Sequence, residues 1–225
     1  MIEVEQTATI WTVTLNRPDK ANSLTEEMLS ELVATMKAAD SARAMILTGR
    51  GKVFSAGADL DAARAGLATS PLWEELSAAI AGLKGFTIAA LNGTLAGGAF
   101  GMALACDLRI APTDAKFFYP AMKLGFLPQP SDPVRMAALI GPSRTKLILM
   151  GAQKLKAEDA LSFGLIDEIV EREQVLSRAE ELARLRCRLR PILRLVSSKC
   201  VSNAGVFACH PALLTGNPVV VFAPI

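Results

Sequence analysis

The chain has 225 residues, enough for one sizeable core; 51% of them are hydrophobic and the mean hydropathy is +0.34. The 24 basic and 22 acidic residues leave a net charge of +2, which argues against a nucleic-acid groove and against an acidic partner. Four cysteines without a Cys-x-x-Cys pair and a single histidine, His210, argue against a metal site and against a Ser-His-Asp triad. Before residue 200, the longest charge-free apolar stretch lies around Leu95 to Cys106; it is shorter than the roughly 18 residues of a membrane span and is interrupted by glycines. No signal peptide is recognisable. We therefore expect a cytoplasmic protein that buries apolar surface between subunits.

The first part of the chain alternates between predicted strands and helices. Alternating residues predict a strand over 9–15, and a loop over 16–24 follows. Apolar residues at helical spacing from Met28 to Met36 predict a helix, capped either by Ser23 with Glu26 or by Thr25 alone. The next predicted elements are a strand at 44–48, a strand at 53–60, a mobile flap at 61–71 and a helix at 73–83. The order strand, strand, helix therefore repeats.

A third unit begins with a strand at 86–91, a turn at Asn92-Gly93 and a helix from Gly98 to Cys106. Strands at 108–111 and 116–119 follow. Four prolines mark 120–133 as a loop, with Asp132 as the N-cap of the next helix. The remaining predictions are helices at 134–140, 143–150 and 157–163, a strand at 165–170 and a charged helix or helix pair at 172–199. Residues 200–225 carry no charge and suggest a strand at 218–222, so we expect this tail to be buried in a neighbour or poorly folded.

Two segments share one design, in which an apolar strand ends in small residues whose backbone N–H groups can converge. They are Ser55-Ala56-Gly57-Ala58-Asp59 and Ala96-Gly97-Gly98-Ala99. Two converging donors form an oxyanion hole, suited to a thioester carbonyl that gains charge as an enolate or a tetrahedral species. Either segment alone is more typical of close packing, so the functional interpretation depends on their occurring together.

Together, and in this order, these segments resemble the crotonase, or enoyl-CoA hydratase/isomerase, superfamily, up to about Lys199. The motifs that carry the resemblance are Asn16-Arg17-Pro18 with Lys20 to Leu24, Phe54 to Leu60, Asn92-Gly93 with Gly97-Gly98 and Cys106-Asp107, Pro120 with Leu124-Gly125, and Ala157 with Gly164 to Asp167. The resemblance implies an α/β spiral of strand-strand-helix units over 1–170 and a C-terminal helical trimerisation region over 171–225. A homotrimer or a dimer of trimers is expected.

The resemblance also implies roles for individual residues. Ala58 and Gly98 would act as catalytic residues by donating the two oxyanion-hole N–H groups. The implied substrate-binding residues are Lys20, Ala21, Ser23, Ala56, Asp59, Leu60, Gly97, Pro120, Ala121 and Leu124. For Lys20 a solvated loop charge is an equal alternative, and for Asp59 a turn or capping role is favoured over chemistry.

The catalytic carboxylates that the resemblance predicts are absent. Hydratases of the family carry two glutamates where this chain has Gly101 and Ala121, and isomerases often carry an acid where it has Gln129. A general acid or base contributes about 10²–10⁴ in rate, so we expect no efficient hydration of crotonyl-CoA. Chemistry that needs only a stabilised enolate stays open, such as decarboxylation of a malonyl-type thioester.

Three nearby residues are candidate replacement acids, although structural roles are favoured for each. Tyr119 is expected as a partly buried strand end, Asp132 as an N-cap and Asp61 as a solvated flap residue. The first hypothesis is an acyl-CoA-processing enzyme of lyase or isomerase type, in fatty-acid or related metabolism, with the CoA thioester as substrate and no cofactor. The alternative is an acyl-CoA-binding pseudoenzyme or scaffold subunit of the same fold. Neither involves a metal, a nucleic acid or a membrane.

Overall fold

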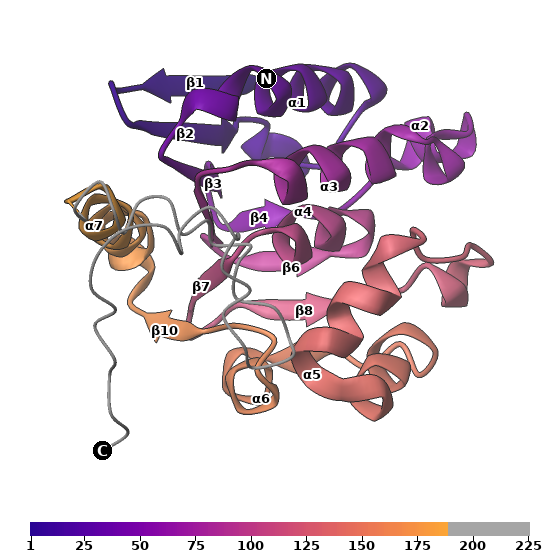
Figure 1. The fold of residues 1–225 in the computed structure, drawn as a ribbon. Helices are drawn as coiled ribbons and strands as arrows, with labels where there is room; N and C mark the ends of the chain where they lie inside the picture. Colours follow the sequence, from indigo (N-terminus) through magenta and orange to yellow (C-terminus); the bar gives the residue numbers. More distant parts are fainter. Residues whose placement is uncertain (189–225) are drawn as a thin grey trace, which may run out of the picture.

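The computed structural model describes residues 1–188, and its larger sheet has six strands. Their spatial order is β1 (Ile2–Gln6), β2 (Ile10–Leu15), β3 (Ala44–Gly49), β5 (Phe86–Ala90), β7 (Leu108–Pro112) and β10 (Glu168–Val170). β1 pairs antiparallel with β2, and every other neighbouring pair is parallel. In Figure 1 these strands descend from β1 at the top to β10.

A smaller sheet lies beside the larger one, and two of its strands precede the glycine-containing segments. It holds β4 (Val53–Ser55), β6 (Thr94–Ala96), β8 (Lys116–Phe118) and β9 (Leu155–Lys156) in that order, with β9 antiparallel to β8. The chain alternates between the sheets, from β3 to β4, from β5 to β6 and from β7 to β8, and helices follow each pair. This repeat confirms the predicted strand-strand-helix unit (Figure 1).

The helices connect the turns of this spiral. They are α1 (Glu26–Ala38), α2 (Leu60–Arg64), α3 (Leu72–Gly82), α4 (Phe100–Ala105), α5 (Ser131–Leu149), α6 (Ala157–Phe163) and α7 (Val175–Arg188). Short 3₁₀ helices span Pro18–Lys20, Ala39–Ser41, Leu67–Thr69, Gly97–Ala99, Met122–Leu124 and Arg172–Gln174. At the start of α1, Thr25 accepts a hydrogen bond from the backbone N–H of Met28, which confirms the second of the two capping alternatives.

The larger sheet is covered on both faces. On β3, Met45 and Leu47 belong to the main core, whereas Ala44 and Ile46 belong to a second cluster that includes Ala179 of α7. Figure 1 shows α7 on the opposite side of the sheet from α1 and α3. A strand buried on both faces needs apolar residues at consecutive positions, and this explains the uninterrupted apolar run at 44–47.

Several predicted boundaries are wrong. The strands β1, β6 and β9 were not predicted. The helix expected from Gly98 begins only at Phe100, because Gly97 has a φ of 57° and the chain first forms a 3₁₀ turn. The two helices expected at 134–140 and 143–150 are one helix, α5, kinked at Gly141, where φ is 78°.

The expected flap at 61–71 also contains regular structure. Asp59 accepts hydrogen bonds from the N–H groups of Asp61 and Ala62, and these bonds begin the short helix α2. The predicted capping role of Asp59 is therefore confirmed. Asp61 lies on the solvent side of α2 and pairs with Arg64, as expected for a solvated residue.

The expected C-terminal region is described only in part. Its helix α7 packs against the larger sheet, while the boundary at residue 170 stays a prediction. The predicted strand at 218–222, the buried tail at 200–225 and His210 lie outside the described residues. Within residues 1–188, no helix is both long and apolar enough to cross a bilayer.

Candidate active site

The two glycine-containing segments meet because the strands that precede them are neighbours. β4 and β6 are parallel, with Ser55 opposite Leu95, so both chains leave the smaller sheet at the same edge. A Cβ placed on Gly57 would stand 3.0 Å from the carbonyl oxygen of Ala96 and 3.3 Å from the Cα of Gly97. Gly57 has a φ of 90°, a conformation that L side chains rarely adopt. Glycine at position 57 therefore permits this contact.

The same contact brings two backbone donors close together. Ala58 pairs with Leu24 in a parallel bridge whose hydrogen bonds use the carbonyl of Gly57 and the N–H of Asp59, so the N–H of Ala58 takes no part in the bridge. Gly98 lies in the first turn of the 3₁₀ helix Gly97–Ala99, where N–H groups have no acceptor within the helix. Its nitrogen is 3.5 Å from the Cβ position of Gly57. Ala58 and Gly98 also line the same cavity.

The loop at 16–24 holds the first segment in place. The carbonyl of Ala21 accepts the N–H of Ala56 at 3.0 Å, and the carbonyl of Asn22 accepts the hydroxyl of Ser55 at 2.8 Å. Asn22 is fully buried and has a φ of 51°, and its side-chain amide donates to the carbonyls of Arg50 and Val53. These contacts fix the backbone that leads into Ala58.

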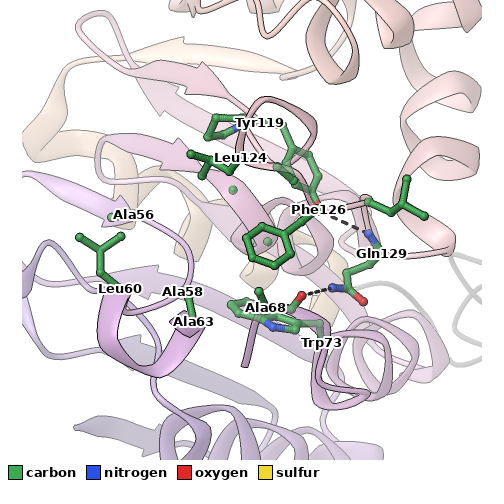
Figure 2. Close-up of a pocket in the computed structure, with 15 residues that line it drawn as sticks. Ala56, Ala58, Leu60, Ala63, Ala68, Trp73, Tyr119, Leu124, Phe126 and Gln129 are labelled. Carbon is green, nitrogen blue, oxygen red and sulfur yellow. Dashed lines mark hydrogen bonds between the residues drawn. The ribbon is translucent and has the colours of Figure 1, made fainter. Parts of the chain in front are cut away.

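A largely apolar cavity of about 140 Å³ opens beside the two segments. Its lining residues are Ala56, Ala58, Leu60, Ala63, Ala68, Trp73, Gly97, Gly98, Tyr119, Pro120, Ala121, Leu124, Phe126, Leu127 and Gln129. Figure 2 shows Leu60 and Ala63 of α2 on one side and Tyr119, Phe126 and Gln129 of the loop before α5 on the other. The exposed side chains of Leu60 and Leu124 leave the rim apolar.

The structure brings together eight of the predicted site residues and leaves four outside the cavity wall. Ala56, Ala58, Leu60, Gly97, Gly98, Pro120, Ala121 and Leu124 line it, whereas Lys20, Ala21, Ser23 and Asp59 do not. Lys20 is exposed. Ser23 and Asp59 are both bonded to the Arg17 guanidinium, which pairs with Asp59 at 2.8 Å. This hydrogen bond holds the pKa of Asp59 below its ordinary value. A substrate contact for these four residues stays a prediction.

Trp73 and Phe126 are wall residues that the sequence interpretation missed. The indole N–H of Trp73 donates to the carbonyl of Leu67 at 2.8 Å, and the ring packs against Gly98, whose Cβ would stand 3.1 Å from it. Trp73 was assigned only to a helix. An aromatic residue at a buried helical position carries no local signal that separates a cavity wall from ordinary core.

Asp132 occupies a different place from the one predicted. Pro130 is the N-cap of α5, and Asp132 lies inside the first turn with its side chain fully buried. Its carboxylate accepts a hydrogen bond from the hydroxyl of Tyr119 at 2.7 Å. Burial raises the pKa of Asp132 to about 7. The N-cap prediction is therefore wrong, because the carboxylate pairs with a residue 13 positions away instead of with its own helix.

The comparisons with known proteins identify the family of the chain. A model of the family "Enoyl-CoA hydratase/isomerase" matches residues 5–200. The chain is 35% identical over 187 residues to the Mycobacterium bovis protein named "Probable enoyl-CoA hydratase echA6", a match that covers 82% of this chain and 77% of that protein. It is 31% identical over 216 residues to the short-chain-enoyl-CoA hydratase of Clostridium acetobutylicum, covering 90% of this chain and 76% of that one.

A solved structure shows the same fold. The crystal structure of the enoyl-CoA hydratase from Bacillus anthracis superposes with a TM-score of 0.82 at 30% identity, covering 90% of this chain and 82% of that chain. The predicted crotonase-like spiral is thereby confirmed. With a family model that matches most of its length and relatives above 30% identity, the chain belongs to the enoyl-CoA hydratase/isomerase family.

Proposed function

We propose that this protein binds an acyl-CoA thioester and stabilises negative charge on its carbonyl oxygen with the backbone N–H groups of Ala58 and Gly98. The observation that supports the proposal is that Ala58 and Gly98 line one apolar cavity, with the Gly98 nitrogen 3.5 Å from the Cβ position of Gly57. One oxyanion-hole donor is worth about 10²–10³ in rate when charge develops on the oxygen. The donors are backbone groups of packed segments, so they need no reorganisation as the charge forms.

The apolar wall suits the acyl chain of such a substrate. Leu60, Phe126 and Leu127 present aliphatic and aromatic surface, and apolar burial contributes about 25 cal/mol per Å². The loop residues Lys20, Ala21 and Ser23 are proposed to contact the CoA portion outside the cavity. Lys20 is exposed, so its ammonium group is free to approach a phosphate.

The reaction differs from standard hydration. Gly101, Ala121 and Gln129 carry no carboxylate, and among the described residues that line the cavity none is acidic. Without an acid and a base at the usual positions, water is neither activated nor given a proton source there. We therefore propose an isomerase-type or lyase-type reaction through an enolate, and we expect poor turnover of crotonyl-CoA.

The test combines binding with a report on the carbonyl bond. Butyryl-CoA labelled with ¹³C at the thioester carbonyl is titrated into the protein by calorimetry, and its carbonyl stretch is followed by isotope-edited infrared spectroscopy. Polarisation by two donors is expected to shift this band to lower frequency than in water. A bound ligand with an unshifted band would refute the oxyanion hole, and absence of binding would refute the whole proposal.

A second measurement separates the enzyme from its alternative. Enoyl-, malonyl- and hydroxyacyl-CoA esters are incubated with the protein, and products are identified by mass spectrometry. A product from any of them supports the enzyme. Binding without a product from the panel supports the acyl-CoA-binding scaffold, which the lack of an acidic side chain in the described cavity wall favours.

The proposal includes a homotrimer, alone or doubled to a hexamer, in the cytoplasm. Apolar side chains are exposed on α5 and near it, among them Val134 at 71% and Met150 at 65%. Burying such residues between subunits removes apolar area from water. Sedimentation equilibrium is expected to give three or six times the monomer mass, and cell fractionation tests the location.

A further inference from the structure

A buried carboxyl group lies behind the cavity wall. The side chain of Asp132 is 0% exposed, and its Oδ2 accepts the hydroxyl of Tyr119 at 2.7 Å. Among the described residues, its Oδ1 has no hydrogen-bond partner. A buried polar atom without a partner costs free energy that an apolar side chain at this position would not. Stability alone therefore gives no reason for an aspartate at this position.

The position of Asp132 relative to α4 suggests such a reason. A Cβ placed on Gly101 would stand 3.0 Å from Oδ1 of Asp132 and 3.6 Å from Oγ of Ser77. The Asp132 carboxyl therefore fills the space into which a side chain at position 101 would point. This is the position where the family resemblance of the sequence predicts a glutamate and where the chain has glycine. A carboxyl group from α5 thus lies in the space that a carboxyl group from α4 would enter.

Tyr119 connects this carboxyl to the cavity. Tyr119 lines the cavity together with Ala58 and Gly98, and its ring stacks on Phe100 with centroids 5.4 Å apart. Its oxygen accepts the backbone N–H of Gln129 at 3.4 Å, a bond drawn in Figure 2. The ring is fixed by these contacts, so a residue of the cavity wall is hydrogen-bonded directly to the buried carboxyl.

The charges around the pair favour exchange of a proton near neutral pH. Burial raises the pKa of Asp132 to about 7, and the negative charge of Glu74 contributes to this rise. The hydrogen bond from Tyr119 and the positive charge of Arg135 act in the opposite direction and lower the pKa of Asp132. Burial and the neighbouring Asp132 raise the pKa of Tyr119, so its hydroxyl stays protonated. Glu74 of α3 accepts a hydrogen bond from the hydroxyl of Ser131 at 3.0 Å, and Arg135 of α5 donates to the Ser131 hydroxyl oxygen at 2.9 Å. A proton acceptor is most effective when its pKa lies near the working pH.

We propose that Tyr119 exchanges a proton with the α-carbon of the bound thioester, and that Asp132 takes up and returns this proton through the Tyr119 hydroxyl. This rests on the proposed acyl-CoA binding. The α C–H bond breaks and its electron pair moves onto the thioester oxygen, which the N–H groups of Ala58 and Gly98 stabilise. The released proton bonds to the Tyr119 oxygen while the original Tyr119 proton passes to Oδ2 of Asp132. The reverse transfers protonate the enolate. Tyr119 is then the catalytic residue, and Asp132 acts through it.

The experiment follows deuterium uptake at the α-carbon of butyryl-CoA in D₂O by NMR, with the wild-type protein and three variants. Tyr119→Phe keeps the ring and removes the hydroxyl, and Asp132→Asn keeps an acceptor for Tyr119 but removes the titrating group. Each is expected to lower the exchange rate by about 10²-fold or more, with affinity for butyryl-CoA changed by less than about threefold. The control is Asp40→Asn, which removes an exposed carboxylate paired with Lys84 and is expected to exchange like the wild type.

The pH profile separates this role from a structural one. In the wild type the exchange rate is expected to rise about tenfold per pH unit below pH 7 and to level off above it, because Asp132 must be ionised to accept the proton. This inflection is expected to disappear in Asp132→Asn. If that variant proves unstable, Tyr119→Phe provides the same comparison of exchange rate with affinity.

The outcomes distinguish this inference from the proposed function. Failure of butyryl-CoA to bind would overturn both. If butyryl-CoA binds but neither variant slows the exchange, the proposed proton transfer by Tyr119 and Asp132 is overturned and the oxyanion hole is left intact. The same holds if the pH profile of the exchange rate keeps its inflection in Asp132→Asn. If the wild type binds butyryl-CoA but exchanges no α-proton, the proposed proton transfer is also overturned, and the acyl-CoA-binding scaffold is favoured.

Discussion

The buried carboxyl of Asp132 predicts an unusual dependence of stability on pH. Its pKa is 3.8 in an unfolded chain and about 7 in the folded protein, because burial disfavours the ionised form. The folded state therefore keeps a proton that the unfolded state has lost. The resulting stabilisation is complete below pH 3.8, decreases as the pH rises and is lost above about pH 7.

The size of this effect follows from the difference between the two pKa values. The change from 3.8 to about 7 corresponds to about 4 kcal/mol of unfolding free energy, lost between pH 4 and pH 7. Asp132→Asn removes the titration and keeps an acceptor for the Tyr119 hydroxyl. Relative to this variant, the wild type is expected to lose about 4 kcal/mol of stability over that range and nothing more above it.

The assay is urea unfolding of both proteins at half-unit steps from pH 4 to pH 8.5, followed by circular dichroism. Comparing the two proteins at each pH cancels the contributions of all other groups. Asp61→Asn, at a side chain that is 91% exposed, serves as the control for loss of a single carboxyl and is expected to show no such step. A wild-type minus Asp132→Asn difference that is constant with pH, or that grows in favour of the wild type as the pH rises, would refute the reasoning.

Three further substitutions test the contacts that build the site. Gly57→Ala places a Cβ 3.0 Å from the carbonyl oxygen of Ala96, at a residue whose φ is 90°. It is expected to lower the free energy of unfolding by about 1–3 kcal/mol and to weaken butyryl-CoA binding. The control is Gly66→Ala, at a φ of 111° with no atom within 4 Å of the new Cβ, which is expected to leave binding unchanged. Calorimetry that shows equal affinities would contradict this. Arg109→Ala removes a 2% exposed guanidinium that donates to several backbone carbonyls, and urea unfolding is expected to show a loss of about 3 kcal/mol; a loss below 1 kcal/mol would count against it. Trp73→Phe deletes the bond to the Leu67 carbonyl and is expected to lower stability by about 1 kcal/mol in the same assay, whereas no loss would argue against that bond.

Local patterns in the chain were sufficient for most of the elements. The helical spacing from Met28 to Met36 and the capping residue Thr25 predicted α1, because a helix of this length presents one apolar stripe and needs an acceptor for its first N–H groups. The small residues after two apolar strands indicated two sets of backbone donors. Residues 55–59 and 96–99 were therefore identified before their contact was known.

Local sequence patterns could not predict the shortest elements or the pairing of residues far apart in the chain. β6 and β9 span only three and two residues, too few for a period to be visible, and they exist because neighbouring strands offer hydrogen bonds. The helix α5 begins at Ser131 although Pro133 follows, since a proline in the first turn removes an N–H that has no acceptor in the helix. Proline content alone had predicted a loop to residue 133.

The sequence by itself therefore determined the strand-strand-helix repeat, the two glycine-containing segments and the absence of carboxylates at 101, 121 and 129. Only the tertiary structure decided that Gly57 contacts Gly97 and that Asp132 turns away from its own helix toward Tyr119. The physical reason is the range of the interactions. Periodicity and capping depend on residues within one or two helical turns. The placement of the Asp132 carboxyl next to Gly101 depends instead on how α4 and α5 pack against each other. A residue that looks like a cap in isolation thus becomes a buried acid in the fold.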